Sequence, residues 1–257
     1  MDHDPLSNEY TGPVGPLVLS GDIESGDYVR LLSKIAADED RFLASHRIIV
    51  AMNDGDVAEA IKIADLVRAT FTEVIVGPLT GSCVGACFLI YAAAAERGTD
   101  RAHLLGLHRP EIDDVRSPAP PSPEPAPAAP ATRDAAAARD AAAARDAAGR
   151  VRAYLEENAV PAYLIEELFR HGPNDVYWLS QHDEEALGAK SPSFVQLFAA
   201  KCGWSDAFEH AVYKGEKPMA DLKAMWVCRD RLAHPAARIV LDTALKDMAP
   251  AGGRRRP

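Results

Sequence analysis

The residues that could do chemistry gather between Cys83 and His108. Cys83 and Cys87 lie four residues apart, and His108 follows the apolar run 104–107. Several hydrolase folds place a histidine in this way, beside a sharp turn that opens a buried helix and carries a nucleophile. The expected start of the helix is Gly85, which has no side chain to form an acyl-enzyme. The stretch therefore has the layout of a nucleophile elbow without the nucleophile.

The cysteines allow more than one interpretation. The N-terminus, MDHDPLSNEY, lacks the basic and then apolar pattern of a signal peptide, so we expect a cytoplasmic protein with free thiols. Cys83 and Cys87 have the spacing of zinc ligands, but a site would need two more ligands, and small core residues are the alternative. Cys202 and Cys228 could pair in an oxidising compartment. We predict no metal site and no cofactor.

Composition excludes some functions. The chain of 257 residues is 47% hydrophobic and 26% charged, which is typical of a soluble globular protein. A net charge of −10 argues against nucleic-acid binding. The chain has no run of about 18 apolar residues, so we expect no membrane span.

Strands and helices alternate in the first half of the chain. Apolar runs predict strands at 17–19, 46–52, 74–76 and 103–107. Helical periodicity predicts a helix that begins at Asp27, a second at 57–71 with Asp56 as its N-cap, and a third at 85–97. The charged residues 38–41 are expected to form a solvated turn. This order predicts an α/β fold with a mostly parallel sheet.

The second half begins with a change of composition. Residues 114–131 contain seven prolines and predict an extended linker. An alanine-rich repeat that starts at Arg133 predicts an exposed helix, either an expendable insertion or a rod that meets a partner. Amphipathic helices are expected from Val151 onward, with a short strand at 175–179 and a helical region to Met248.

Five segments in order resemble the ClpP/crotonase superfamily, and among its members the ClpP-like serine hydrolases. They are GPLVLSGDI, IIVAMNDGDVAEAIKIADLVR, TEVIVGPLTGSCVGACFLIYAAAAERG, LLGLHRP and NDVYWLSQHDEEALG. The resemblance implies stacked ββα units over residues 16–190, with 115–150 as an insertion. We predict a disordered lead-in at 1–15, a helical C-terminal extension at 191–248 and a disordered tail at 249–257.

The resemblance also implies roles for particular residues. The family's catalytic serine falls on Gly85, its histidine on His108 and its aspartate on Asp175. The backbone N–H groups of Gly55 and Ala86 would form the oxyanion hole. The turn that carries Gly55 reads Asn-Asp-Gly-Asp-Val, which is about two residues shorter than the family's Asn-Ser-x-Gly-Gly-x-Val.

Two functions follow from these matches. The first is a pseudoenzyme that serves as a binding or assembly module, with a peptide or protein ligand. The second is an active hydrolase or peptidase that uses a displaced nucleophile, Ser82 or Cys87, with His108 as the base. Members of the family usually form trimers or rings through the region after the histidine, so we expect a homo-oligomer.

Overall fold

The computed structural model describes residues 16–77, 81–100, 103–110, 130–172 and 174–248, with the backbone alone at 130–141 and 143. The expected lead-in, the C-terminal tail and nearly all of the proline-rich linker lie outside the described residues. The strands are β1 (Leu17–Ile23), β2 (Arg47–Gly55), β3 (Glu73–Val76), β4 (Cys83–Val84), β5 (Glu96–Thr99), β6 (Leu105–Leu107) and β7 (Tyr177–Trp178). The helices are α1 (Asp27–Ala37), α2 (Glu39–Ser45), α3 (Val57–Ala69), α4 (Cys87–Ala93), α5 (Pro130–Glu157), α6 (Ala162–Arg170), α7 (Gln181–Leu187), α8 (Pro192–Cys202), α9 (Asp206–Tyr213) and α10 (Met219–Met248).

A parallel sheet in the order β1-β2-β3-β5 forms the centre of the molecule. β2 lies between β1 and β3, and its residues 48–52 are buried. This burial explains the nearly continuous apolar run in the sequence, because a parallel strand covered on both faces has no polar side. A second small sheet, β4-β6-β7, joins β4 and β6 in parallel and β6 and β7 in antiparallel. The α/β prediction with a mostly parallel sheet is confirmed.

Two elements differ from the prediction. Residues 38–41 were expected to be a turn, but α2 begins at Glu39. The acidic first turn of α2 suits a helix N-terminus, and its Phe42 and Leu43 are buried. The helix expected at 85–97 is shorter, because Ala94 leaves the helical conformation with ψ 144°. The residues that follow form β5, where Glu96 pairs with Glu73 of β3. The tertiary pairing therefore outweighs the helical pattern at this point.

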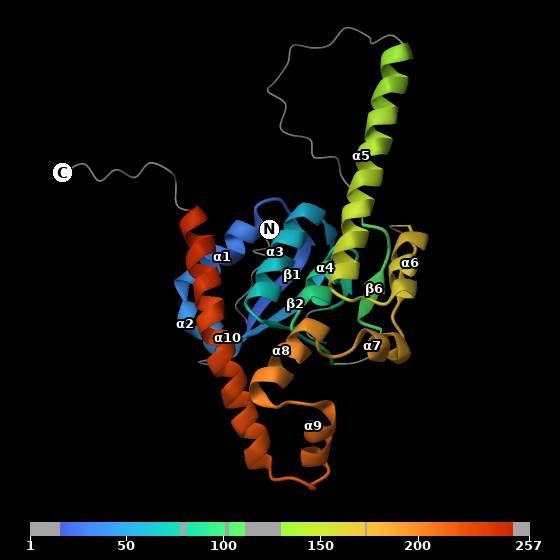
Figure 1. Ribbon diagram of the computed structural model, residues 1–257. Helices are drawn as coiled ribbons and strands as arrows, with labels where there is room; N and C mark the ends of the chain where they lie inside the picture. Colours follow the sequence, from blue (N-terminus) through green and yellow to red (C-terminus); the bar gives the residue numbers. More distant parts are fainter. Residues whose placement is uncertain (1–15, 78–80, 101–102, 111–129, 173, 249–257) are drawn as a thin grey trace, which may run out of the picture.

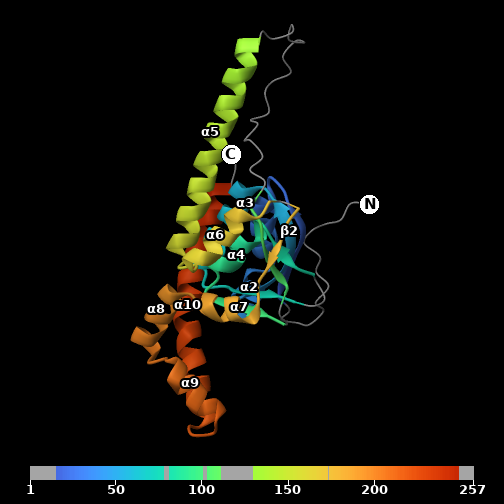
Figure 2. The same cartoon turned by 90° about the vertical axis from the view of Figure 1, so that its right-hand side faces the viewer.

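Helices cover the sheet and extend beyond it. Figure 1 shows α1 and α3 beside the strands, with the long α10 running past them, and α10 contacts α1, α2 and α3. The predicted alanine-rich helix is confirmed as α5. Its C-terminal part packs on the body through buried residues such as Val151 and Leu155, whereas its N-terminal part projects from the body (Figures 1 and 2).

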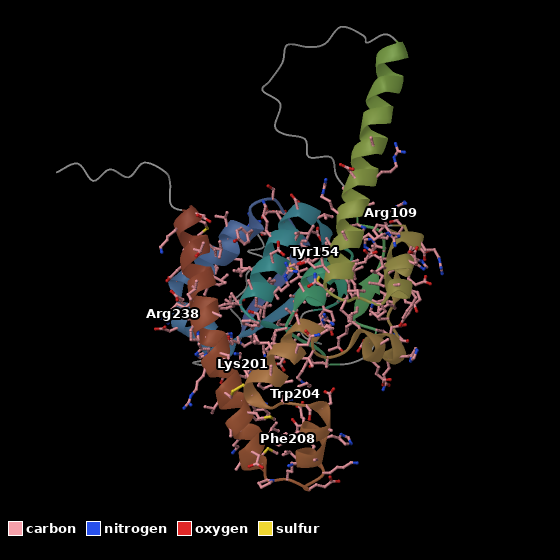
Figure 3. The ribbon with its side chains drawn as sticks, viewed as in Figure 1. Arg109, Tyr154, Lys201, Trp204, Phe208 and Arg238 are labelled. Carbon is pink, nitrogen blue, oxygen red and sulfur yellow. A yellow bond between two sulfur atoms is a disulfide. The ribbon has the colours of Figure 1, made fainter. Side chains whose placement is uncertain are left out.

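The helices α8, α9 and the first half of α10 form a unit of their own, which extends away from the sheet (Figure 1). A second hydrophobic cluster holds it together, with Phe198, Trp204 and Leu222 among its buried members, and connects it to the body through Ala95 and Phe71. Trp204 and Phe208 are labelled there in Figure 3. The second half of α10 packs instead on the main core through Ala237 and Leu241. We call α8, α9 and residues 219–233 of α10 the C-terminal unit.

The four cysteines correct the expectation of free thiols. Cys83 pairs with Cys87, and Cys202 pairs with Cys228. The first pair lies in the predicted elbow, and its thiolates are therefore not available to zinc. The second pair joins α8 to α10, as the alternative for an oxidising compartment predicted. No helix within the described ranges has the length and apolar character needed to cross a membrane.

Candidate functional site

The elbow predicted from the sequence lies between β4 and α4. Gly85 follows β4 directly and has φ +59°, a left-handed conformation that favours glycine. Its N–H donates to the carbonyl of Gly106 over 3.3 Å, and Cys83 donates to Leu104 over 2.8 Å. These bonds hold the elbow against β6, and β6 in turn leads to His108.

No side chain fits at position 85 without movement of its neighbours. A Cβ built there would lie 2.6 Å from Oδ1 of Asp54 and 2.8 Å from Cε1 of His108. Real Cβ atoms are essentially never found at such distances. The space that a serine side chain would need is therefore already filled, chiefly by the carboxylate of Asp54.

Asp54 reaches the elbow from the end of β2. Its Oδ1 accepts a hydrogen bond from the backbone N–H of Ala86 over 2.9 Å. Its Oδ2 lies 3.7 Å from Nδ1 of His108. A carboxylate thus occupies the N–H group that the resemblance assigned to the oxyanion hole, and it lies beside the residue assigned as the base.

His108 is buried, with 4% of its surface exposed. Its Nδ1 lies 3.1 Å from the carbonyl oxygen of Arg109. Because a carbonyl oxygen only accepts hydrogen bonds, Nδ1 is the donor in this contact. The Asp54 side chain is more exposed, at 20%. A ligand that approached His108 from the Asp54 side would have to displace that carboxylate.

Asp175 lies elsewhere. Its Oδ2 is 2.8 Å from Nδ1 of His171, and its side chain is 74% exposed. Glu167 lies on the other side of the same imidazole, 3.2 Å from Nε2. Both carboxylates favour the charged imidazole and raise the pKa of His171, the Asp175 hydrogen bond most. Within the described residues, the carboxylate beside His108 is Asp54, and Asp175 orients His171.

The two candidates for a displaced nucleophile, Cys87 and Ser82, lie in different surroundings. Cys87 is buried and bonded to Cys83, so the prediction of a free Cys87 thiolate is wrong. Cys87 is the first residue of α4, and its partner Cys83 lies four residues earlier, in β4. Ser82 is half-buried just before β4. It makes no hydrogen bond to His108 among the residues that the structure describes.

Gly55 is needed for close packing. It ends β2 with φ +137°, and a Cβ there would lie 2.2 Å from the carbonyl oxygen of Ile23. The next residue, Asp56, donates its N–H to the same oxygen over 2.8 Å. Asp56 also caps α3 as predicted, because its side chain accepts from the N–H groups of Ala58 and Glu59. The short turn thus ties β2 to β1.

The role of Asp54 was not predicted from the sequence. Gly85, Ala86 and His108 were all predicted, and the structure brings them together. Asp54 lies 32 residues before Ala86, and no local pattern connects the two. The available signal was an acidic residue at the position where the turn of the ClpP-like hydrolases, which the sequence resembles, has serine, in a chain that also lacks the nucleophile.

Comparison with known proteins gives a distant likeness among solved structures. No protein-family model matches the chain, and no curated protein matches it. Among solved structures, the chain is similar to a mutant of the 1510-N membrane-bound stomatin-specific protease, at 14% identity and a TM-score of 0.37. The match covers 74% of this chain and 86% of that chain.

Proposed function

We propose that this chain is a ClpP-like peptidase homologue that has lost acyl transfer and serves as a binding or assembly module. The observation that carries the proposal is the carboxylate of Asp54, which fills the place of the side chain missing at Gly85. The order of elements supports the family: a parallel sheet, an elbow that opens a buried helix, and a strand that delivers His108.

Asp54 opposes acyl transfer in two ways. It accepts the hydrogen bond of Ala86 N–H, which a tetrahedral intermediate would need. It also places negative charge where the oxyanion would develop. Loss of one oxyanion donor costs an acyl-transfer enzyme roughly 10²- to 10³-fold in rate, and loss of the nucleophile costs roughly a millionfold. The occupied N–H of Ala86 and the missing nucleophile together favour a site that does not carry out acyl transfer.

The two disulfides bear on the compartment. Stable disulfides persist in oxidising environments and are rare in the cytosol. We therefore favour an oxidising compartment over the cytoplasmic location expected from the sequence.

Labelling with a fluorophosphonate probe tests the proposal. We compare the wild type with Gly85→Ser, Asp54→Ala and the double variant Asp54→Ala/Gly85→Ser. The wild type should not label. Gly85→Ser should label weakly or not at all, because its Cβ would collide with Asp54 and His108. The double variant removes the main collision and frees Ala86 N–H, so it should label most strongly if His108 is still a competent base.

The outcomes separate the two functions. Labelling of the wild type would overturn the proposal and favour the displaced-nucleophile hydrolase, and loss of that label in Ser82→Ala would identify the serine. Detectable and equal labelling of Gly85→Ser and the double variant would show that Asp54 does not close the site. Circular dichroism of each variant controls for folding.

Assembly is the second part of the proposal. Family resemblance favours a homo-oligomer formed through the region after His108, and the projecting part of α5 follows that region in the chain. Light scattering coupled to size-exclusion chromatography would test it. A monomeric mass at micromolar concentration would contradict the oligomer.

A further inference from the structure

A second unusual group lies far from the elbow, at the junction of α2 and β2. His46 has φ +45° and is 8% exposed. Neither of its ring nitrogens has a hydrogen-bond partner of normal geometry within the described residues. Buried imidazole nitrogens are normally satisfied, so this ring requires an explanation.

The ring of His46 stacks on His234 of α10. The two ring centroids lie 4.5 Å apart, and the planes differ by 24°. His234 is the residue before Pro235, which interrupts the hydrogen-bond ladder of α10 because proline has no N–H. Before this point α10 packs in the C-terminal unit, and after it α10 packs on the main core. The histidine pair therefore marks the joint between the two clusters.

Charged groups surround the joint and are already paired. A polar cavity of about 70 Å³ beside His46 is lined by Arg47, Glu73, Glu96 and Arg229. Arg47 pairs with Glu73 over 2.7 Å, and Arg229 pairs with Glu96 over 2.8 Å. Arg229 also lies 3.0 Å from Asp230 on α10. The carboxylates of Glu73, Glu96 and Asp230 are thus already paired with arginines, so they would stabilise a protonated His46 less.

We infer that the His46–His234 stack is an acid-sensitive contact that holds α10 to the α/β body and releases it when His46 is protonated. A charged imidazole at this place would be buried, would face a second imidazole and would lie near the Arg229 guanidinium. Each of these effects favours opening of the joint, which exposes His46 to water.

The titration of His46 supports the inference. Burial first, and then His234 and Arg229, lower the pKa of His46 to about 4, while Asp230 and the Thr70 carbonyl act in the opposite direction. An exposed histidine has a pKa of about 6.5. The open state therefore binds the proton more tightly, so opening becomes more favourable as pH falls from about 6.5 toward 4. Above about pH 7 the ring is neutral and the contact is complete.

Hydrogen exchange tests this on the whole chain. After correction for intrinsic rates, amides of residues 236–248 in the wild type should exchange about tenfold faster at pH 5.5 than at pH 7.5, and about 70-fold faster at pH 4.5. Amides of β2 and β3 should change much less. An equal increase in β2 and β3, or none in α10, would overturn the inference.

Two variants assign the effect to the stack. His46→Asn keeps a residue that tolerates φ > 0 and cannot titrate, so it should remove most of the pH dependence. His234→Asn should weaken it, since it leaves His46 without a facing imidazole. His182→Asn, at an exposed position of α7, should behave as the wild type. If His46→Asn does not fold, His234→Asn decides, and an unchanged pH profile in that variant would contradict the inference.

Discussion

At the scale of single residues, two glycines decide how the candidate site is built. Gly85 leaves room for Asp54, and Gly55 lets β2 approach β1. Both positions were singled out from the sequence, but the contact that requires a glycine at each of them could not be predicted. The atom that would collide with an added Cβ belongs to a distant segment of the chain. It lies in Ile23 for Gly55 and in Asp54 for Gly85.

Gly55→Ala should be strongly destabilising. A Cβ 2.2 Å from the Ile23 carbonyl oxygen, at φ +137°, forces the backbone of β1 or β2 to move. We expect a loss of about 3 kcal/mol in the free energy of unfolding, measured by chemical denaturation. Gly149→Ala is the matched control, since nothing lies within 4 Å of its Cβ in α5. It should gain about 0.5 to 1 kcal/mol. Equal effects of the two substitutions would contradict the steric argument.

At the scale of elements, a buried arginine joins three helix ends. Arg97 of β5 is 6% exposed and donates to the carbonyls of Ala92 and Leu187, at the ends of α4 and α7. It also lies 3.4 Å from the carbonyl of Asn158, just after α5. Burial lowers its pKa to about 10, so it stays charged at pH 7. A cation at helix C-termini is stabilised by the helix dipoles.

Arg97→Met should therefore loosen the junction of α4, α5 and α7. Removal of the guanidinium leaves carbonyl oxygens buried without donors, and we expect a loss of about 2 to 3 kcal/mol in the free energy of unfolding. Arg170→Met removes an arginine that is 66% exposed and paired with Glu167, and it should cost less than about 1 kcal/mol. A loss at Arg97 as small as that at Arg170 would show that water replaces the guanidinium.

The same scale shows what the sequence could predict. Sequence patterns were sufficient for features that depend on neighbouring residues in the chain, such as the cap of α3 at Asp56 and the apolar run of β2. They failed at Glu96, because its strand forms by pairing with β3, which is distant in the chain. Asp54 belongs to the same class, since its partner Ala86 is distant in the chain. The candidate site could thus be located from the sequence, but its closure by Asp54 could not.

At the scale of the whole molecule, the α/β body and the C-terminal unit are joined along α10 and at the contact of Phe194 with Phe71, and each part holds one disulfide. Cys83 and Cys87 are fully buried at the elbow. Cys202 and Cys228 are half-buried in the C-terminal unit, where the bond crosses from α8 to α10 (Figure 3). A reductant therefore has easier access to Cys202–Cys228 than to Cys83–Cys87.

A mild thiol reductant under native conditions should open Cys202–Cys228 first, because thiol–disulfide exchange requires direct approach to a sulfur atom. Alkylation and peptide mass analysis would follow each pair, and we expect at least a tenfold difference in rate, since Cys83–Cys87 must wait for the body to open. Denaturant should abolish the difference, which is the control. Equal rates in native buffer would mean that the elbow opens as readily as the C-terminal unit, and an elbow that opens so readily would expose His108 and Ala86 to ligands despite Asp54.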